Sequence, residues 1–195
     1  MPASFIYTIP VIMYKISALL FFGLVALLSC KKEDATVPVT TTPRPFDQAV
    51  ETESILGIID NEASCFYARD YECWKAHYIH EDYTFQGWNR ADGTFDAKVG
   101  WGELDEKAGT YIKNNPKKEG QGERPQVIRQ FMKVKYFTNT LAYVSWDQYN
   151  PDGDAKIYPH SLETRLMQNI NGSWKIANST SFYDYLKQFP ADSLK

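Results

Sequence analysis

Two histidines at helical spacing are the first groups in this sequence that could do chemistry. His77 and His80 would share one face of a helix, and Glu81 and Asp82 follow them directly. Imidazole and carboxylate groups can bind a metal ion, but zinc needs three or four ligands. The third histidine of the chain is His160, far away in the sequence. We expect a helix end whose histidines lie near the C-terminal dipole, and neither a metal ion nor a cofactor.

Polar residues within the alternating C-terminal part of the chain could line a ligand site. Side chains of a strand alternate between two faces, and one face here is mostly apolar and should meet the helices. The polar members of that face are Gln130, Gln148, His160, Thr164 and Asn178. Apolar walls with a few converging polar groups are typical of a ligand pocket, although these groups could also bond to each other or to loop backbone.

The opposite face of the same strands would carry mixed charges and aromatic rings, including Glu163, Arg165 and Tyr183. This composition suits a sheet face that is solvated or that forms a dimer. A single β-bulge would reverse the assignment for all residues beyond it. Glu163 and Arg165 therefore stay candidates for the pocket as well.

Four tryptophans could form an aromatic cage around a ligand. The chain contains 5 Trp, 13 Tyr and 11 Phe, and such side chains bury large areas and also line ligand sites. The candidate cage residues are Trp74, Trp88, Trp101 and Trp146. Helical and strand spacing explains three of them as core residues, which is the interpretation we prefer.

Cys30 indicates where the protein is located. Lys15 precedes the apolar run 16–29, which ends at a small residue, and this is the pattern of a secretory signal. Lys15 also divides the apolar N-terminal region into pieces shorter than the roughly 20 residues of a spanning helix. A retained signal anchor is the alternative. Met13 would make a complete start for the signal, and we expect it to be the true initiator.

Leu27 to Cys30 resembles the lipobox of bacterial lipoproteins. The resemblance implies removal of residues 1–29, lipidation of Cys30 and anchoring to a membrane on its extracytoplasmic side, periplasmic or surface-exposed. Residues 30–45 are charged and rich in Thr and Pro, which predicts a flexible tether. Residues 46–195 are long enough for one domain with a core. The net charge of −3 argues against a nucleic-acid partner.

Apolar periodicity in the domain predicts three helices followed by four strands. The helices are expected at 46–66, 70–79 and 101–112, with a β-prone segment at 82–89. The strands are expected at 127–137, 141–149, 160–170 and 173–183. Asn171 and Gly172, between the last two strands, are typical of a tight hairpin turn. The predicted class is α+β, with three N-terminal helices packed on a curved, mainly antiparallel sheet.

Cys65 and Cys73 are the cysteines that remain after lipidation of Cys30. On one continuous helix their Cα atoms would be about 12 Å apart, which is beyond the reach of a disulfide. A bridge would need a break in the helix near Arg69 and Asp70. We expect two buried free thiols.

Several sequence phrases in this order resemble the nuclear-transport-factor-2-like (NTF2-like) superfamily, including its SnoaL-like and ketosteroid-isomerase-like branches. They are RDYECW at 69–74 leading to HYIH at 77–80, GWGEL at 100–104, and ETR at 163–165 continuing to NGSWKIA at 171–177. The resemblance covers about residues 46–187. It implies a cone in which the sheet wraps around the helices and encloses a pocket, and it implies a homodimer formed through the sheet face.

The resemblance also gives Asp82 a possible role. In ketosteroid-isomerase-like relatives an acidic residue soon after the second helix acts as the base that moves a proton beside a carbonyl. Such a base needs an apolar pocket and oxyanion donors, for which Tyr67, Tyr78 or His160 are candidates. The alternative is that Asp82 is a capping or turn residue.

These observations favour a lipid-anchored domain that binds a small, partly apolar molecule in the cone. The residues expected around the ligand are Trp74, Tyr78, Trp88, Trp101, Trp146, Gln148, His160, Asn178, Glu163 and Arg165. One alternative is an enzyme of the isomerase, dehydratase or hydrolase type that uses Asp82 or His160 as acid and base. Another is an envelope interaction module that uses the outer sheet face.

Overall fold

The computed structural model describes residues 45–118, 124–152 and 156–194. The predicted signal peptide and the lipidation site at Cys30 therefore lie outside the described residues. Among the described helices, none is both long and apolar enough to cross a membrane. The described residues belong to one compact unit.

Six strands form one sheet in the order β2-β1-β6-β5-β4-β3. All neighbours are antiparallel except β1 and β6, which run parallel. The strands are β1 (Phe85–Asn89), β2 (Phe95–Val99), β3 (Ile128–Thr138), β4 (Leu141–Tyr149), β5 (Ile157–Ile170) and β6 (Ser173–Pro190). With the helices this gives the predicted α+β class.

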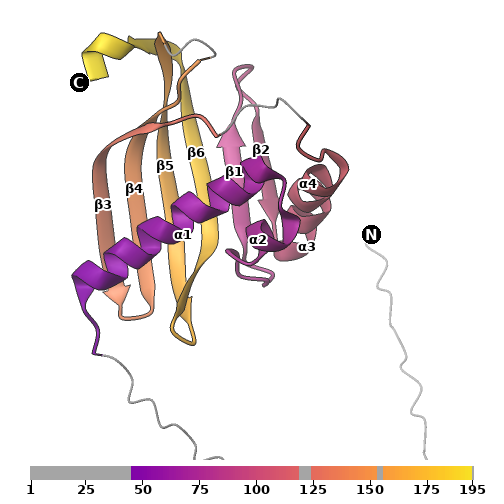
Figure 1. Ribbon diagram of the computed structural model, residues 1–195, viewed down its shortest axis with the longest axis vertical. Helices are drawn as coiled ribbons and strands as arrows, with labels where there is room; N and C mark the ends of the chain where they lie inside the picture. The colour runs from indigo at the N-terminus through magenta and orange to yellow at the C-terminus, as the bar shows by residue number, and fades with distance from the viewer. Residues whose placement is uncertain (1–44, 119–123, 153–155, 195) are drawn as a thin grey trace, which may run out of the picture. The chain divides into compact units, whose positions relative to one another are not determined.

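The helices cover one face of this sheet (Figure 1). The long helix α1 (Gln48–Ala68) crosses the strands, and the short helices lie beside β1 and β2. They are α2 (Tyr71–Lys75), α3 (Trp101–Leu104), the π-helical turn η1 (Asp105–Gly109) and α4 (Thr110–Asn114); a 3-10 turn, η2 (Ala191–Leu194), ends the described chain. The predicted third helix is confirmed as the continuous segment from α3 to α4.

Local sequence signals explain where α1 begins and ends. The Asp47 carboxylate accepts hydrogen bonds from the backbone N–H groups of Ala49 and Val50, at 2.9 and 3.3 Å, and so caps the N-terminus. At the other end Arg69 adopts a left-handed conformation, with φ of 61°, and its N–H bonds to the last turn. This stop lets the chain turn and begin α2 at Asp70.

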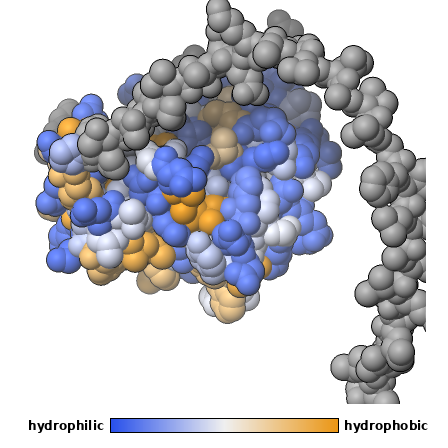
Figure 2. Space-filling model, turned by 90° about the horizontal axis from the view of Figure 1, so that it is seen from below, coloured by the Kyte–Doolittle hydropathy of each residue, from blue (hydrophilic) through white to orange (hydrophobic). Residues whose placement is uncertain are grey.

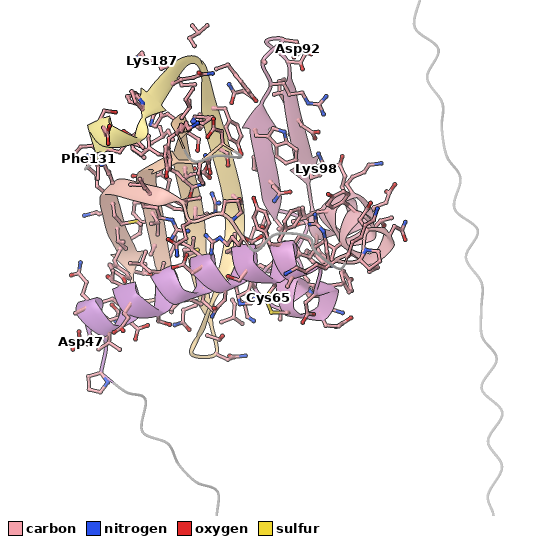
Figure 3. All side chains as sticks on the ribbon, turned by 45° about the horizontal axis from the view of Figure 1, so that its top comes forward. Asp47, Cys65, Asp92, Lys98, Phe131 and Lys187 are labelled. Atoms are coloured by element: carbon pink, nitrogen blue, oxygen red, sulfur yellow. A yellow bond between two sulfur atoms is a disulfide. The ribbon has the colours of Figure 1, made fainter. Side chains whose placement is uncertain are left out.

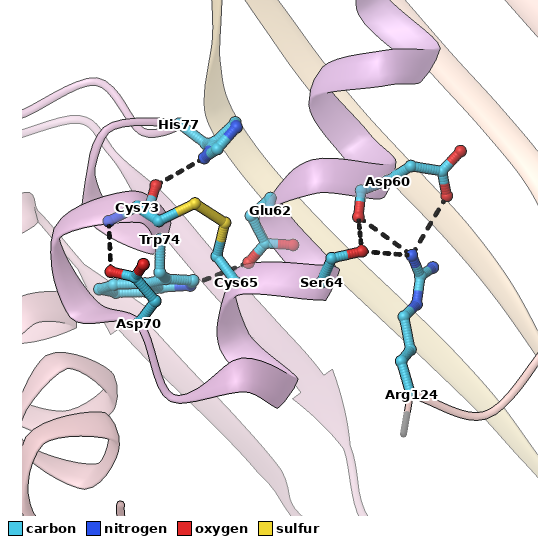
Figure 4. The surroundings of a disulfide bond; sticks show 9 residues. All are labelled: Asp60, Glu62, Ser64, Cys65, Asp70, Cys73, Trp74, His77 and Arg124. Atoms are coloured by element: carbon cyan, nitrogen blue, oxygen red, sulfur yellow. Dashed lines mark hydrogen bonds and ion pairs between the residues drawn. A yellow bond between two sulfur atoms is a disulfide. The ribbon is translucent and has the colours of Figure 1, made fainter. Parts of the chain in front are cut away.

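The break after α1 corrects the prediction of two free thiols. Cys65 lies in the last turn of α1, Cys73 lies in α2, and the reversal at Arg69 brings their Cα atoms to 5.6 Å. A disulfide joins the two cysteines (Figure 4). The distance argument for one continuous helix does not apply, because the helix breaks at the position that a bridge requires.

The second helix is shorter than predicted, and a strand was missed. Residues beyond Lys75 leave the helix because Tyr78 forms a parallel bridge with Ile176, which accepts from the N–H of Ile79 at 3.0 Å. Tertiary pairing here overrides local helical periodicity. Strand β2 follows the turn at 91–93 and pairs with β1, which completes a hairpin that the sequence showed only in part.

The predicted faces of β5 and of the later part of β6 are wrong. In β5 the odd-numbered residues pair with the buried residues of β4, so Glu163 is only 2% exposed and faces the helices rather than the solvent. In β6 the cause is a bulge: Leu166 pairs with Asn178 while its neighbour Met167 pairs with Ile176, so Ala177 is an extra residue. Beyond it, the odd-numbered residues of β6 point inward.

The core lies between the helices and the inner face of strands β4, β5 and β6. Its largest fully buried side chains are Trp74, Trp146 and Trp174. On the molecular face shown in Figure 2, hydrophilic side chains predominate and hydrophobic ones form small groups. Of the candidate cage residues, Trp74 and Trp146 belong to this core and Trp101 packs against it, which agrees with the preferred interpretation of the tryptophans.

Candidate functional site

A cavity of about 440 Å³ lies between α1 and the inner face of the sheet. We call it the cone pocket. Its lining residues come from α1, β1, β5 and β6 and are Glu62, Gln86, Gly87, Trp88, Arg165, Ser179, Ser181, Tyr183 and Tyr185. The walls are thus more polar than the partly apolar pocket that the sequence predicts.

Glu62 is held at the pocket by two neutral hydrogen-bond donors. Its Oε1 accepts from Trp74 Nε1 and from the Tyr78 hydroxyl, both at 2.9 Å (Figure 4 shows the Trp74 contact). Gln86 Nε2 in turn donates to the Tyr78 hydroxyl oxygen at 3.4 Å, which ties β1 to this network. Among the described residues no cation forms an ion pair with Glu62, and both donors to its Oε1 are neutral.

Arg165 supplies the positive charge on the strand side of the pocket. Its Nη1 donates to Glu163 Oε2 at 3.1 Å and to the backbone oxygen of Thr164 at 2.8 Å. Arg165 Nε is buried and has no hydrogen-bond partner among the described residues. A buried donor without a partner costs free energy.

Glu163 lies behind Arg165 and is fully engaged by the protein itself. Its carboxylate accepts from the hydroxyls of Ser161, at 2.8 Å, and Ser181, at 2.6 Å, in addition to Arg165. A buried carboxylate with this many partners acts as an anchor. Its role here is to orient the guanidinium.

Two tyrosines at the pocket keep their protons over a wide pH range. Burial raises the pKa of Tyr78 well above its ordinary value, and the negative charge of Glu62 raises it further. Burial, and then Glu163, raise the pKa of Tyr183 to about 12. Both hydroxyls are therefore neutral hydrogen-bonding groups at physiological pH, which is the state in which Tyr78 donates to Glu62.

Beside the pocket, Trp146 lies between two guanidinium groups. The Arg165 and Arg129 Cζ atoms are 5.1 and 5.3 Å from its ring centroid, within cation–π range. Trp146 Nε1 donates to Gln148 Oε1 at 3.2 Å. Burial lowers the pKa of Arg129, which pairs with Asp60 at 2.9 Å. The contact with the Trp146 ring helps to fix the position of Arg165.

Only part of the predicted ligand-binding set lines the pocket. Trp88 and Arg165 do, and Tyr78 adjoins it through Gln86. Glu163 lies directly behind Arg165. The structure therefore brings together four of the predicted residues, two of which the strand alternation had placed on the wrong face.

Three tryptophans and Gln148 of the predicted set belong to the packed interior. Trp74 is fully buried and stacks on Trp101, with ring centroids 5.8 Å apart, and Trp101 also stacks on His80 at 4.0 Å. Trp146 is equally buried. Gln148 accepts a hydrogen bond from the Trp146 indole N–H and donates one to Asn150 Oδ1.

The predicted acid–base residues lie outside the cone pocket. Asp82 is exposed in the turn before β1. His160 Nε2 lies 2.6 Å from Asp147 Oδ1, and its ring packs on Tyr149 and Phe189. Asn178 accepts from the Thr180 hydroxyl at 2.9 Å, on the outer side of the bulge. Their proposed roles stay predictions without support from pocket geometry.

Sequence reasoning missed most of the lining residues. In β6 they recur at every second position as Ser179, Ser181, Tyr183 and Tyr185, an alternation visible in the sequence. The alternation was assigned to the outer face because the bulge at Ala177 gives no local signal. Glu62 was missed because it stands on the apolar side of a helix, where a carboxylate is normally unexpected.

One group of potential metal ligands occurs among the described residues. The ligand atoms of Cys65, Cys73 and His77 lie within 4.8 Å of one another. The disulfide uses both sulfur atoms, and His77 Nδ1 lies 2.7 Å from the backbone oxygen of Cys73. The group therefore offers no thiolate, which is the form of cysteine that binds metals.

Known structures support the fold and leave the activity open. No family model and no curated protein sequence matches the chain. An NTF2-like protein of unknown function from Shewanella oneidensis MR-1 is 23% identical, with 68% of this chain and 98% of that chain covered and a TM-score of 0.49. A protein of unknown function with a cystatin-like fold from Nostoc punctiforme is 11% identical, with coverages of 71% and 94% and a TM-score of 0.51.

A putative scytalone dehydratase from Novosphingobium aromaticivorans is 10% identical, with 73% of this chain and 88% of that chain covered and a TM-score of 0.50. At such identities similarity establishes the fold alone. The domain shares the cystatin-like α+β fold of these structures, which agrees with the fold class predicted from the sequence.

Proposed function

We propose that this protein is a lipid-anchored receptor domain outside the cytoplasm that binds a small polar molecule in the cone pocket. The observation that carries the proposal is the pair of charged residues in the pocket wall, Glu62 and Arg165. The disulfide between Cys65 and Cys73 supports an oxidising compartment, which agrees with the signal sequence and Cys30.

The charged residues of the pocket indicate which groups a ligand should carry. Arg165 is already paired with Glu163, so its unpartnered Nε needs only an acceptor, whereas the Glu62 carboxylate has no cationic partner among the described residues. A ligand with a cationic or donor group toward Glu62 and an acceptor toward Arg165 satisfies both. The aromatic rings of Trp88 and Tyr183 suit an aromatic body that carries these groups.

Three matched probes test this assignment in the full-length chain. L-tyrosine carries both groups, tyramine lacks the carboxylate, and hydroxyphenylpropionate lacks the ammonium. Titration calorimetry should show the tightest binding for tyrosine. Glu62→Gln should weaken tyramine, and Arg165→Lys, which keeps the charge but loses Nε, should weaken hydroxyphenylpropionate, each by about tenfold.

Asp82→Asn is the matched control, because Asp82 is exposed and outside the pocket. It should leave all three affinities unchanged. If none of the probes gives saturable heat, or if both pocket variants bind them like the wild type, the ligand class is wrong.

A second candidate function is self-association through the outer sheet face. We propose that this face forms a homodimer, because Leu162 and Phe182 are cross-strand partners that stay 41% and 53% exposed. Exposed apolar pairs on an open sheet favour contact with a second protein surface. Sedimentation analysis should show a dimer that Phe182→Asp converts to a monomer. Phe95→Asp, at an exposed site on β2, is the control, and a monomeric wild type would exclude this function.

A further inference from the structure

A second cavity, of about 280 Å³, adjoins the cone pocket. Gln86 and Trp88 line both, and strand β1 thus forms the common wall. The remaining walls come from the end of α1, from β2 and from the helical segment 101–114. They are Phe66, Lys98, Lys107, Ala108 and Tyr111. We call this the side cavity.

Aromatic rings held by other contacts form most of its wall. Phe66 and Tyr111 stack with centroids 5.9 Å apart. Arg69 lies over both rings, at 5.0 and 4.8 Å, and Nη2 donates to the Tyr111 hydroxyl at 3.1 Å. Because the guanidinium clamps the two rings, the wall is preformed, and a flat apolar body could enter between it and Trp88 without reordering it.

The charged residues that line the side cavity are both lysines. Lys98, labelled on β2 in Figure 3, is only 8% exposed, and its Nζ lies 4.5 Å from the Trp88 ring centroid. It pairs with Asp96, but Asp96 also pairs with Arg90, so one carboxylate serves two cations. Lys107 stands at the cavity from the helical side. Lys107 pairs with Glu106 at 3.2 Å, but Glu106 is not among the residues that line the cavity, so the charged groups on its described wall are both cations.

The surroundings of Lys98 lower its pKa. Burial is the main cause, and the neighbouring charges of Arg90 and Lys107 lower the pKa further, while Glu103 opposes them. An anion placed between the lysines would reduce the repulsion.

We propose that the side cavity is a second ligand site that takes a small amphipathic anion, with a flat aromatic body between Phe66, Trp88 and Tyr111 and an acidic group at Lys98 and Lys107. Its charge preference is opposite to that of the cone pocket, where we propose that the carboxylate of Glu62 binds a cation or a hydrogen-bond donor. The two sites therefore bind different molecules, and this proposal stands independently of the proposed function.

Anilinonaphthalenesulfonate and its neutral counterpart N-phenylnaphthylamine are matched probes for the full-length chain. The sulfonate should bind in fluorescence titrations, with energy transfer from tryptophan that falls in Trp88→Phe. Ala108→Phe fills the cavity and should weaken both probes about tenfold. Lys107→Met leaves a half-exposed helix position intact and should weaken the sulfonate several-fold while sparing the neutral probe.

Lys117→Met, an exposed lysine outside the cavity, is the control and should behave like the wild type. Thermal melts check that each variant is folded, since anilinonaphthalenesulfonate also binds loosened cores. Wild-type affinity in both Ala108→Phe and Lys107→Met overturns the site. Loss only in Ala108→Phe overturns the preference for an anion. Loss in Arg165→Lys instead would place the probe in the cone pocket and overturn the proposal equally.

Discussion

Glu62 shows at the scale of a single residue how a site can conflict with stability. A carboxylate that is buried with only neutral donors loses hydration without gaining a counter-ion. Glu62→Gln keeps an oxygen for Trp74 and Tyr78 but removes the charge. We expect the free protein to gain about 1 kcal/mol in the free energy of unfolding while it loses affinity for cationic probes.

Urea denaturation at neutral pH measures this gain. Glu72→Gln, at an exposed position of α2, should leave the unfolding free energy within about 0.5 kcal/mol. A clear loss of stability in Glu62→Gln would mean that the carboxylate is compensated in the free protein, and the argument for a cationic ligand would lose its basis.

Tyr183 gives a prediction for alkaline pH. Its folded-state pKa of about 12 lies above the unfolded value near 10, mainly because of burial. The folded state thus keeps a proton that the unfolded state loses, and stability is complete below pH 10 and declines as the pH rises to about 12. The total decline from this group is about 3 kcal/mol.

Tyr183→Phe should flatten that part of the pH profile in urea denaturation. Tyr185→Phe, which replaces a more exposed ring, should leave the decline in place. An unchanged slope in Tyr183→Phe would show that another group, such as Tyr78, dominates the alkaline transition.

At the scale of elements, the disulfide holds α2 against the end of α1. The two cysteines are separated by 8 positions in the sequence. Closing a loop of this length stabilises the fold by about 2–3 kcal/mol, because it lowers the chain entropy of the unfolded state. Replacing Cys73 by Ala should lower the unfolding free energy by that amount. It should also weaken ligands of Glu62, because Trp74, the donor to Glu62, is the next residue in α2.

Unfolding in the presence and absence of a reductant checks the disulfide prediction. Reductant should shift the midpoint of the wild type and leave the Cys73 variant unchanged. A thiol assay that finds two reactive cysteines in the folded, unreduced domain would contradict the bridge.

The elements differ in how well the sequence predicts them. The hairpin at Asn171 and Gly172, with positive φ of 53° and 86°, and helix α1 were predictable because their signals are local. The end of α2 and the pairing of β2 depend on contacts with distant strands. The site was predicted least well, because a single residue, Ala177, decides which side chains of β6 enter the pocket.

At the scale of the whole molecule, Cys30 should determine where the domain is found. Cys30→Ser removes the thiol that lipidation needs. Stable anchoring to a membrane takes two lipid chains, or one chain together with a second membrane-binding signal. We expect the variant to leave the membrane fraction and appear in the soluble extract after fractionation. A wild-type chain that stays soluble would contradict anchoring, and a variant that stays in the membrane would favour a retained signal anchor.

The extra residue in β6 acts as a change of phase within one strand. Before Ala177 the even positions, Trp174 and Ile176, build the core; after it the odd positions, from Ser179 on, line the cone pocket. The core residues of β6 therefore lie at even positions and its pocket residues at odd positions. Mutations at the odd positions can change the pocket without changing the core. Deleting Ala177 would remove the bulge and leave Ser179, Ser181 and Tyr183 on the pocket side, so in related chains that lack the extra residue the core positions and the pocket positions of this strand should share one parity.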